Sequence, residues 1–209
     1  MKDALLLQVG IGAEFADMLD VSHARHGAYC AAHGFDFLDI TEPVAPTPPM
    51  WQRYFCIARA FAAGYQFVAA LDADALIADT SIDLRSASTK PLAMKWAQAP
   101  GGEPASYNTG VMYARAASAP LFAALVNRAP LPGVKQGGPW WLLPDGEARI
   151  CNELLRQERW AMQTEPLGAF WNCVLGIEDV PQPVVVAWHG IEDTTERLRL
   201  MRRWLQVHA

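Results

Sequence analysis

The sequence has few cysteines, no excess of basic residues and no long apolar run. Its four cysteines, at positions 30, 56, 151 and 173, show neither close pairing nor the spacing of metal ligands. This pattern argues against a disulfide framework and against a zinc site built on thiolates. We therefore predict buried free thiols in a reducing compartment, which for this chain is the cytoplasm.

Positive charge is also scarce, since 17 Lys and Arg face 22 Asp and Glu, for a net charge of −5. A nucleic-acid-binding domain carries a basic surface, so we expect no nucleic-acid partner. No apolar run approaches the length of a membrane span. The short apolar run near the N-terminus follows Asp3 and is too brief for a signal peptide, so we expect the first strand there.

The chain does contain enough apolar residues to build a sizeable core. It has 209 residues, of which 52% are hydrophobic and 19% charged, a composition typical of a globular protein. No internal repeat or linker interrupts it. We predict one domain over residues 1–209, with a nucleotide-binding half at 1–80 and a half at 81–209 that closes the metal and acceptor side.

Strand and helix patterns alternate along the first 80 residues. We expect strands at 5–9, 35–40 and 67–77, and helices at 15–33 and 51–64. This order predicts an α/β fold with a mostly parallel central sheet flanked by helices. Later in the chain we expect strands at 92–96, 110–114 and 184–187, helices at 120–127, 147–158 and 194–207, and a long loop at 130–146.

Two acids at the end of the third expected strand are the most informative feature. Asp72 and Asp74 follow an apolar run and are separated only by Ala73. On an extended backbone both carboxylates point to the same side, where a divalent cation would relieve their repulsion. Parallel sheets bind ligands at this end of their strands. An ordinary strand that ends in a solvated loop explains the pair equally well on these residues alone.

Four further residues have side chains or positions that suit such a ligand. Asn108 can donate to and accept from sugar hydroxyls, and Gly110 permits close backbone approach, although both are also common turn residues. His189 follows an apolar strand and could give Mn²⁺ an imidazole, or could be an ordinary buried or surface histidine. Arg53 could reach a phosphate or a sugar, or could lie on a solvated helix face.

Four blocks of the sequence, taken in order, resemble one enzyme family. They are Trp51–Tyr54, Leu71–Ala75 with its Asp-x-Asp pattern, Tyr107–Met112 and Trp188–Gly190. Together they resemble the galactosyl/mannosyl/xylosyltransferase family of GT-A glycosyltransferases, which transfers sugars from nucleotide sugars with retention. The resemblance covers about residues 51–190.

The resemblance implies a GT-A-like, Rossmann-like fold and a metal-dependent transfer from a UDP- or GDP-sugar to a carbohydrate or glycolipid acceptor, in surface polysaccharide or glycolipid assembly. It implies Mn²⁺, or Mg²⁺, held by Asp72, Asp74 and His189. The donor nucleotide sugar would contact these three residues and the following set: Val9, Gly10, Ile11, Arg53, Ala73, Asn108, Gly110 and Gly190.

The same resemblance places Asp145 and Glu147 near the acceptor and the anomeric carbon, with Asn108 as a third catalytic candidate. A retaining transfer requires no general base from the protein. If the reaction inverts, Asp145 or Glu147 becomes the candidate base.

Two other functions fit parts of the pattern. A non-catalytic module that binds nucleotide sugars or carbohydrates would keep the same pocket without turnover. A phosphatase with an aspartate nucleophile carries its acid pair on the first strand, with Thr or Val where this chain has Leu76. The basic amphipathic segment 197–205 suits either a solvated helix or peripheral contact with the inner membrane face.

Overall fold

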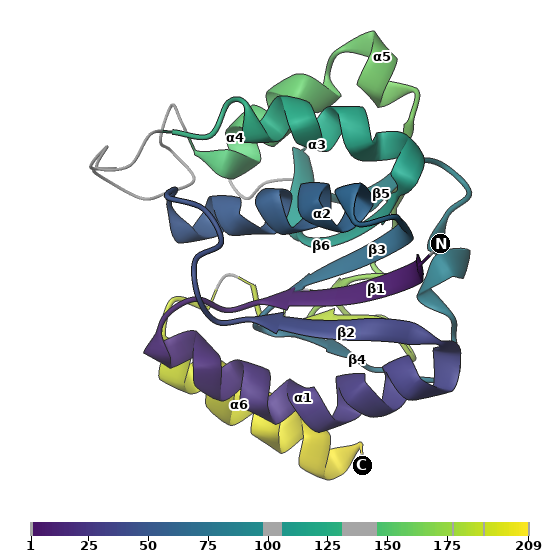
Figure 1. Ribbon diagram of the computed structural model, residues 1–209. Helices are drawn as coiled ribbons and strands as arrows, with labels where there is room; N and C mark the ends of the chain where they lie inside the picture. The colour runs from purple at the N-terminus through teal and green to yellow at the C-terminus, as the bar shows by residue number, and fades with distance from the viewer. Residues whose placement is uncertain (1, 98–105, 131–145, 177, 190, 209) are drawn as a thin grey trace.

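The computed structural model describes residues 2–97, 106–130, 146–176, 178–189 and 191–208 (Figure 1). Its first part alternates strands and helices: β1 (Lys2–Val9), α1 (Ala13–His33), β2 (Phe35–Ile40), the 3₁₀ helix η1 (Pro49–Trp51), α2 (Gln52–Ala62), β3 (Tyr65–Asp72) and β4 (Ala75–Ile77). The alternation expected over residues 1–80 is therefore present.

The remaining elements are shorter and less regular. They are the 3₁₀ helix η2 (Leu84–Ala87), β5 (Leu92–Ala97), β6 (Ser106–Arg115), the 3₁₀ helix η4 (Ala116–Ser118), α3 (Ala119–Val126), α4 (Glu147–Leu155), α5 (Glu158–Ala161), β7 (Thr164–Leu167), β8 (Cys173–Val174), β9 (Val185–Ala187) and α6 (Thr194–Val207).

A six-stranded sheet in the order β2-β1-β3-β6-β5-β7 forms the centre of the fold. Strand β6 runs antiparallel to its neighbours β3 and β5, and the other pairs described in this sheet are parallel. The expected mostly parallel, helix-flanked α/β sheet is confirmed. The C-terminal ends of β1 and β3 meet at one edge, where Val9 pairs with Asp72.

A second sheet of three short strands, in the order β4-β9-β8, lies beside the first. Its presence corrects one expectation, because no single strand carries both acids. Strand β3 ends at Asp72, the chain turns at Ala73 and Asp74, and β4 then joins the second sheet. The turn is required because the chain leaves one sheet for another between the two acids.

Two strands were missing from the expected set. Strand β7 contains Pro166, which removes a backbone donor, and it lies at the edge of the main sheet where proline is tolerated. Strand β8 has only 2 residues, too few for a periodic pattern. The helix expected at 147–158 ends earlier, since α4 stops at Leu155 and a separate short helix, α5, begins at Glu158.

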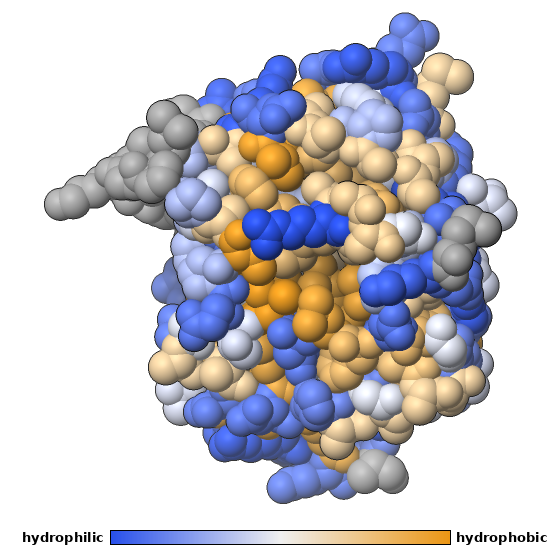
Figure 2. Space-filling view, viewed as in Figure 1, coloured by the Kyte–Doolittle hydropathy of each residue, from blue (hydrophilic) through white to orange (hydrophobic). Residues whose placement is uncertain are grey.

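Helices cover the main sheet on both sides. Figure 1 shows α2, α3 and α4 in one group, and α1 beside α6 in the other. Helix α1 ends at Gly34, whose φ of 71° is costly for residues with a Cβ. The face seen in Figure 2 has hydrophobic residues gathered at its centre, between the two helical groups.

Two composition-based expectations can be compared with the structure. All four cysteines are buried and free, as predicted. Among the described residues, no helix has the length and apolar content needed to cross a membrane.

Candidate active site

Asp72 and Asp74 stand where the chain passes from the main sheet to the small one. Gly10, which follows β1, packs directly beneath the turn, since a Cβ on it would lie 2.9 Å from the Ala73 Cβ. Asp74 is 3% exposed, and Asp72 is partly buried. The acids thus lie at the C-terminal edge of parallel strands, where this class of sheet binds its ligands.

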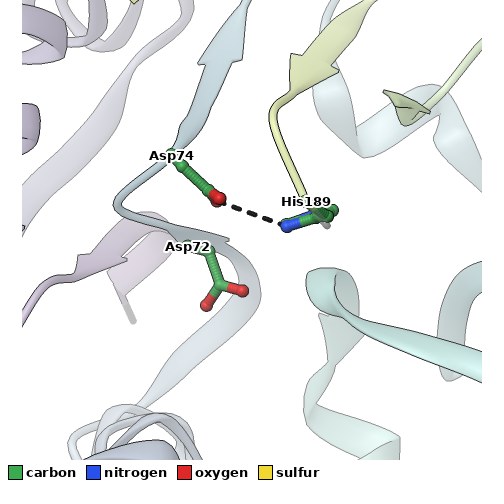
Figure 3. Close-up of side chains that lie close together, drawn as sticks. All are labelled: Asp72, Asp74 and His189. Carbon is green, nitrogen blue, oxygen red and sulfur yellow. Dashed lines mark ion pairs between the residues drawn. The ribbon is translucent and has the colours of Figure 1, made fainter. Parts of the chain in front are cut away.

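The third member of the cluster comes from the other end of the chain. Strand β9 places His189 beside the acids, and the Trp188 N–H donates to the Asp74 carbonyl at 3.1 Å. The His189 Nδ1 lies 3.3 Å from the Asp74 Oδ1 (Figure 3). One ligand atom from each of Asp72, Asp74 and His189 can be chosen so that all lie within 4.8 Å of one another.

Gly110 leaves the space that the side chains of His189 and Asp72 occupy. A Cβ at this position would lie 2.5 Å from the His189 Nε2 and 2.8 Å from the Asp72 Oδ2. Both distances are shorter than van der Waals contact, so a side chain would displace the imidazole and the carboxylate. The absence of a Cβ lets two potential metal-binding atoms converge on the same backbone.

Two arginines take up the remaining carboxylate oxygens. The Arg53 guanidinium from α2 lies 2.6 Å from the Asp72 Oδ1. The Arg197 guanidinium from α6 donates to the Asp74 Oδ2 at 3.2 Å. Each acid therefore has one oxygen paired with an arginine and a second oxygen on the side of His189 or Gly110.

The pKa values of Asp72 and Asp74 shift in opposite directions. Burial raises the pKa of Asp72 although Arg53 and His189 oppose the change. Burial also disfavours the Asp74 carboxylate, but His189 and Arg197 outweigh it and lower the pKa of Asp74. Burial works against protonated His189, yet Asp74 holds the pKa of the imidazole above its ordinary value.

The residues fit a divalent cation on chemical grounds. The Asp74 Oδ1 and the His189 Nε2 are buried and lack a hydrogen-bond partner within the described part of the chain. The Asp74 Oδ1 has an ion-pair contact with the His189 Nδ1 at 3.3 Å but no hydrogen bond of normal geometry, and the His189 Nε2 has neither among the described residues. Buried polar atoms are normally hydrogen-bonded, so both atoms remain available to a ligand. Two carboxylates and an imidazole form a donor set that suits Mn²⁺.

Glu147 lies behind this cluster and is 2% exposed. The Tyr54 hydroxyl donates to its Oε2, and the Thr109 hydroxyl donates to its Oε1 at 2.9 Å. Burial raises the pKa of Glu147, against the opposing charge of Arg53. Arg53 in turn donates to the Thr109 carbonyl. Glu147 therefore belongs to the network that holds Arg53 against Asp72.

The other expected contacts are placed as follows. Val9 pairs with Asp72, and the Gly10 N–H donates to the Ile40 carbonyl at 3.0 Å, while Ile11 packs on the core. The Asn108 Oδ1 accepts from the Gly110 N–H at 2.9 Å, which holds the backbone beside the acids. Asp145 and Gly190 lie outside the described residues.

Arg197 is a residue of the cluster that the sequence does not indicate, because the pattern of segment 197–205 predicts only a basic amphipathic helix. Nothing in the sequence connects that helix with an acid 123 positions earlier. Gln8 is a second residue outside the expected set, and its amide donates to the Asp72 carbonyl at 3.0 Å. A signal for Gln8 was available, since it is a polar residue within the otherwise apolar strand Ala4–Val9.

Comparison with known proteins identifies the fold. No family model matches the sequence, and no curated protein does. Among solved structures, a glycosyltransferase involved in glycosylation of the major capsid of PBCV-1 is similar, with a TM-score of 0.66 and 17% identity over 96% of this chain and 98% of that one.

Two further structures are similar at lower TM-scores. Glycosyltransferase GlyE of Streptococcus pneumoniae TIGR4 has a TM-score of 0.55 and 14% identity, and the match covers 99% of this chain and 64% of GlyE. A Drosophila β-1,4-galactosyltransferase 7 mutant, in complex with manganese, UDP-Gal and xylobiose, has a TM-score of 0.51 and 13% identity over 93% and 73% of the chains. The chain therefore has the fold of glycosyltransferases, as the four sequence blocks led us to expect.

Proposed function

We propose that this protein transfers a glycosyl group from a nucleoside diphosphate sugar to an acceptor hydroxyl, with a divalent cation held by Asp72, Asp74 and His189. The observation that carries the proposal is the convergence of carboxylate and imidazole atoms over Gly110. They converge at the ligand-binding edge of a fold shared with glycosyltransferases.

The charge distribution around the acids supports a diphosphate leaving group. A bound Mn²⁺ or Mg²⁺ would supply a Lewis acid for the charge that develops on the departing diphosphate. Arg53 and Arg197 already border the two acids and would add fixed positive charge on either side. Asn108 holds the Gly110 backbone in place and keeps its amide nitrogen for a sugar hydroxyl.

The finer chemistry follows the family resemblance. A UDP-sugar with Mn²⁺ is the first donor to examine, because one structurally similar protein holds manganese and UDP-Gal. A GDP-sugar is the alternative. We propose retention, a carbohydrate or glycolipid acceptor, and a role in surface polysaccharide or glycolipid assembly. If the reaction inverts, Asp145 or Glu147 is the proposed base.

We place the protein in the cytoplasm, where its free thiols would stay reduced. Helix α6 buries Met201 and packs its apolar side against α1. A peripheral contact with the inner membrane face would therefore use the exposed basic side of α6, which includes Arg199, Arg202 and Arg203.

The decisive experiment incubates the protein with UDP- and GDP-sugars in Mn²⁺ and measures release of the nucleotide, with and without candidate saccharide acceptors. Asp72→Asn and Asp74→Asn should each lower the rate by at least about 100-fold, the scale expected for a lost electrostatic stabiliser. Asp20→Asn changes an exposed acid on α1 and should keep the parental rate.

Three results would contradict the proposal. Full activity of either Asp72→Asn or Asp74→Asn would show that the acid pair is not required for transfer. Saturable sugar-nucleotide binding without nucleotide release, with every acceptor tried, would identify a binding module. Hydrolysis of phosphate monoesters in place of sugar transfer would identify a phosphatase.

A further inference from the structure

We propose that Gln8, supported by Ser22 and His26, positions the turn that carries Asp72 and Asp74. The inference rests on the proposed function, because positioning matters only if the acids bind a cation. Gln8, Ser22 and His26 are all 0% exposed, so their polar groups must be satisfied within the protein.

The carbonyl groups of the turn lie at the boundary between the two sheets. Strand β3 ends at Asp72, and β4 begins at Ala75 in the second sheet. The Gln8 Nε2 lies 3.0 Å from the Asp72 carbonyl oxygen and 3.1 Å from that of Ala75. It also lies 3.4 Å from the Ala73 carbonyl oxygen. The amide nitrogen of Gln8 therefore lies within hydrogen-bond distance of three carbonyl oxygens of the turn.

The fourth carbonyl of the turn is bound from the other side. The Trp188 N–H donates to the Asp74 carbonyl at 3.1 Å, directly before His189. The backbone positions of the two acids and of the histidine are thus fixed relative to one another by Gln8 beneath the turn and Trp188 beside it. Groups behind metal ligands commonly fix ligand orientation in this way.

The orientation of the Gln8 amide is itself determined. Its Oε1 accepts from the Ser22 hydroxyl at 2.7 Å and faces the His26 Nδ1 at 3.0 Å. The His26 Nε2 accepts from the Ile77 N–H at 3.2 Å, so the ring is neutral and its Nδ1–H donates to Gln8. If the Gln8 amide were rotated by 180°, its oxygen would face the three carbonyl oxygens of the turn. Its NH₂ group would then face the Ser22 hydroxyl and the His26 N–H, which are both donors. Ser22 and His26 therefore keep the Gln8 donor aimed at the turn.

The network also reaches the far side of the turn. Ile77 ends β4, and the His26 ring binds its N–H. The chain is consequently held at both ends of the segment 72–77, by Gln8 on β1 and by His26 on α1. Neither β1 nor α1 supplies a side chain to the cluster of Asp72, Asp74 and His189, so both elements act on it only through the backbone of the turn.

Two readouts test the proposal in Gln8→Met, which keeps the length of the side chain and removes the amide. The first is amide hydrogen exchange of metal-free protein, in which residues 74–77 should exchange at least about tenfold faster. The second is the Mn²⁺ dissociation constant from electron paramagnetic resonance, which should rise about 10–100-fold, the range for lost partners of metal ligands.

Thr164→Val is the matched control. The Thr164 hydroxyl is also buried and donates to the Trp160 carbonyl at 2.9 Å, but it lies in β7. The control should lose thermal stability without any change in Mn²⁺ affinity or in the exchange of residues 74–77. Ser22→Ala serves as a milder second variant if Gln8→Met fails to fold, and should shift both readouts in the same direction by about threefold.

The proposal is overturned if the folded Gln8 or Ser22 variant behaves like Thr164→Val, with lower stability but unchanged exchange and unchanged Mn²⁺ affinity. Wild-type protein that binds no Mn²⁺ would instead contradict the proposed function. In that case the exchange measurement still decides whether Gln8 holds the turn.

Discussion

The Arg197 guanidinium donates to the Asp74 Oδ2 at 3.2 Å, although 123 positions separate the two residues. The Asp74 side chain is 4% exposed and that of Arg197 is 20% exposed, so little water screens the pair. Arg197 also donates to the Ile191 carbonyl, which fixes the guanidinium at the start of α6. The C-terminal helix is therefore part of the acid cluster.

Arg197→Gln should lower the free energy of unfolding by about 1–3 kcal/mol in metal-free protein, because Asp74 loses one buried countercharge but keeps His189. Mn²⁺ should restore more stability to this variant than to the parent, since the cation would replace the missing charge. Urea unfolding with and without Mn²⁺ measures both effects. Arg202→Gln, on the exposed side of α6, is the control. Equal gains from Mn²⁺ in variant and parent would refute this view of the pair.

Gly110→Ala should lower turnover by at least about 100-fold, because the new Cβ would overlap the His189 imidazole and the Asp72 carboxylate. Mn²⁺ affinity should fall as well, and both can be measured on the folded variant. Gly168→Ala introduces a methyl group that meets nothing within 4 Å and should have little effect. Normal Mn²⁺ binding by Gly110→Ala would show that the cation does not lie against this backbone.

Acid should destabilise the protein through His26, which burial and the charges of Arg25 and His23 hold at a pKa of about 3, against 6.5 ordinarily. In the folded state His26 stays neutral, whereas in the unfolded chain it binds a proton below pH 6.5. The contribution of His26 to the free energy of unfolding is therefore fully present above pH 6.5 and is lost as the pH falls. Between pH 6.5 and 5 the loss amounts to about 2 kcal/mol.

Comparison of the parent with His26→Gln isolates this effect in urea unfolding at pH 7 and pH 5. The raised pKa of His189 makes the free energy of unfolding change with pH in the opposite direction. This contribution is the same in both proteins, so it cancels when they are compared. The variant should be less stable at pH 7 but lose about 2 kcal/mol less on acidification. Gln206→Ala changes an exposed, non-titratable side chain on α6 and should keep the parental pH dependence. If His26→Gln lost as much unfolding free energy as the parent between pH 7 and pH 5, the acid destabilisation would not come from His26.

Glu147→Gln should act mainly on stability. Both oxygens of Glu147 accept hydrogen bonds, and the carboxylate faces Arg53, so the amide should cost about 1–3 kcal/mol of unfolding free energy. We expect kcat to change by less than about tenfold, whereas loss of a general base costs about 10²–10⁴-fold. Glu153→Gln, on the exposed side of α4, is the control. A larger fall in kcat, with loss of the acidic limb of the pH–rate profile, would make Glu147 the base.

Much of the fold follows from local sequence patterns. The apolar run Phe67–Leu71 forms a buried strand in any packing that covers both of its faces, and Gly34 ends a helix because of its own backbone freedom. The alternation of strands and helices over residues 1–80 then leaves few sheet orders to consider. Short strands such as Cys173–Val174 escape this reasoning, since their pairing exists only once β9 lies beside them.

Residue types and their near neighbours already indicate an acid pair at the end of a buried strand and a histidine after a late apolar strand. They also indicate that Gly110 lies between the Asn108 amide and an apolar segment. These are local facts, set by residue type and by neighbours within a few positions.

The groups that surround the acids are set by the packing of distant elements. Asp72 and Asp74 meet His189, Arg197 and the Gln8 amide because the chain crosses from one sheet to another at Ala73. The partners come from opposite ends of the sequence, and no periodicity links them. Their approach depends on the packing of β1, β9 and α6 around the turn, which is a property of the whole fold.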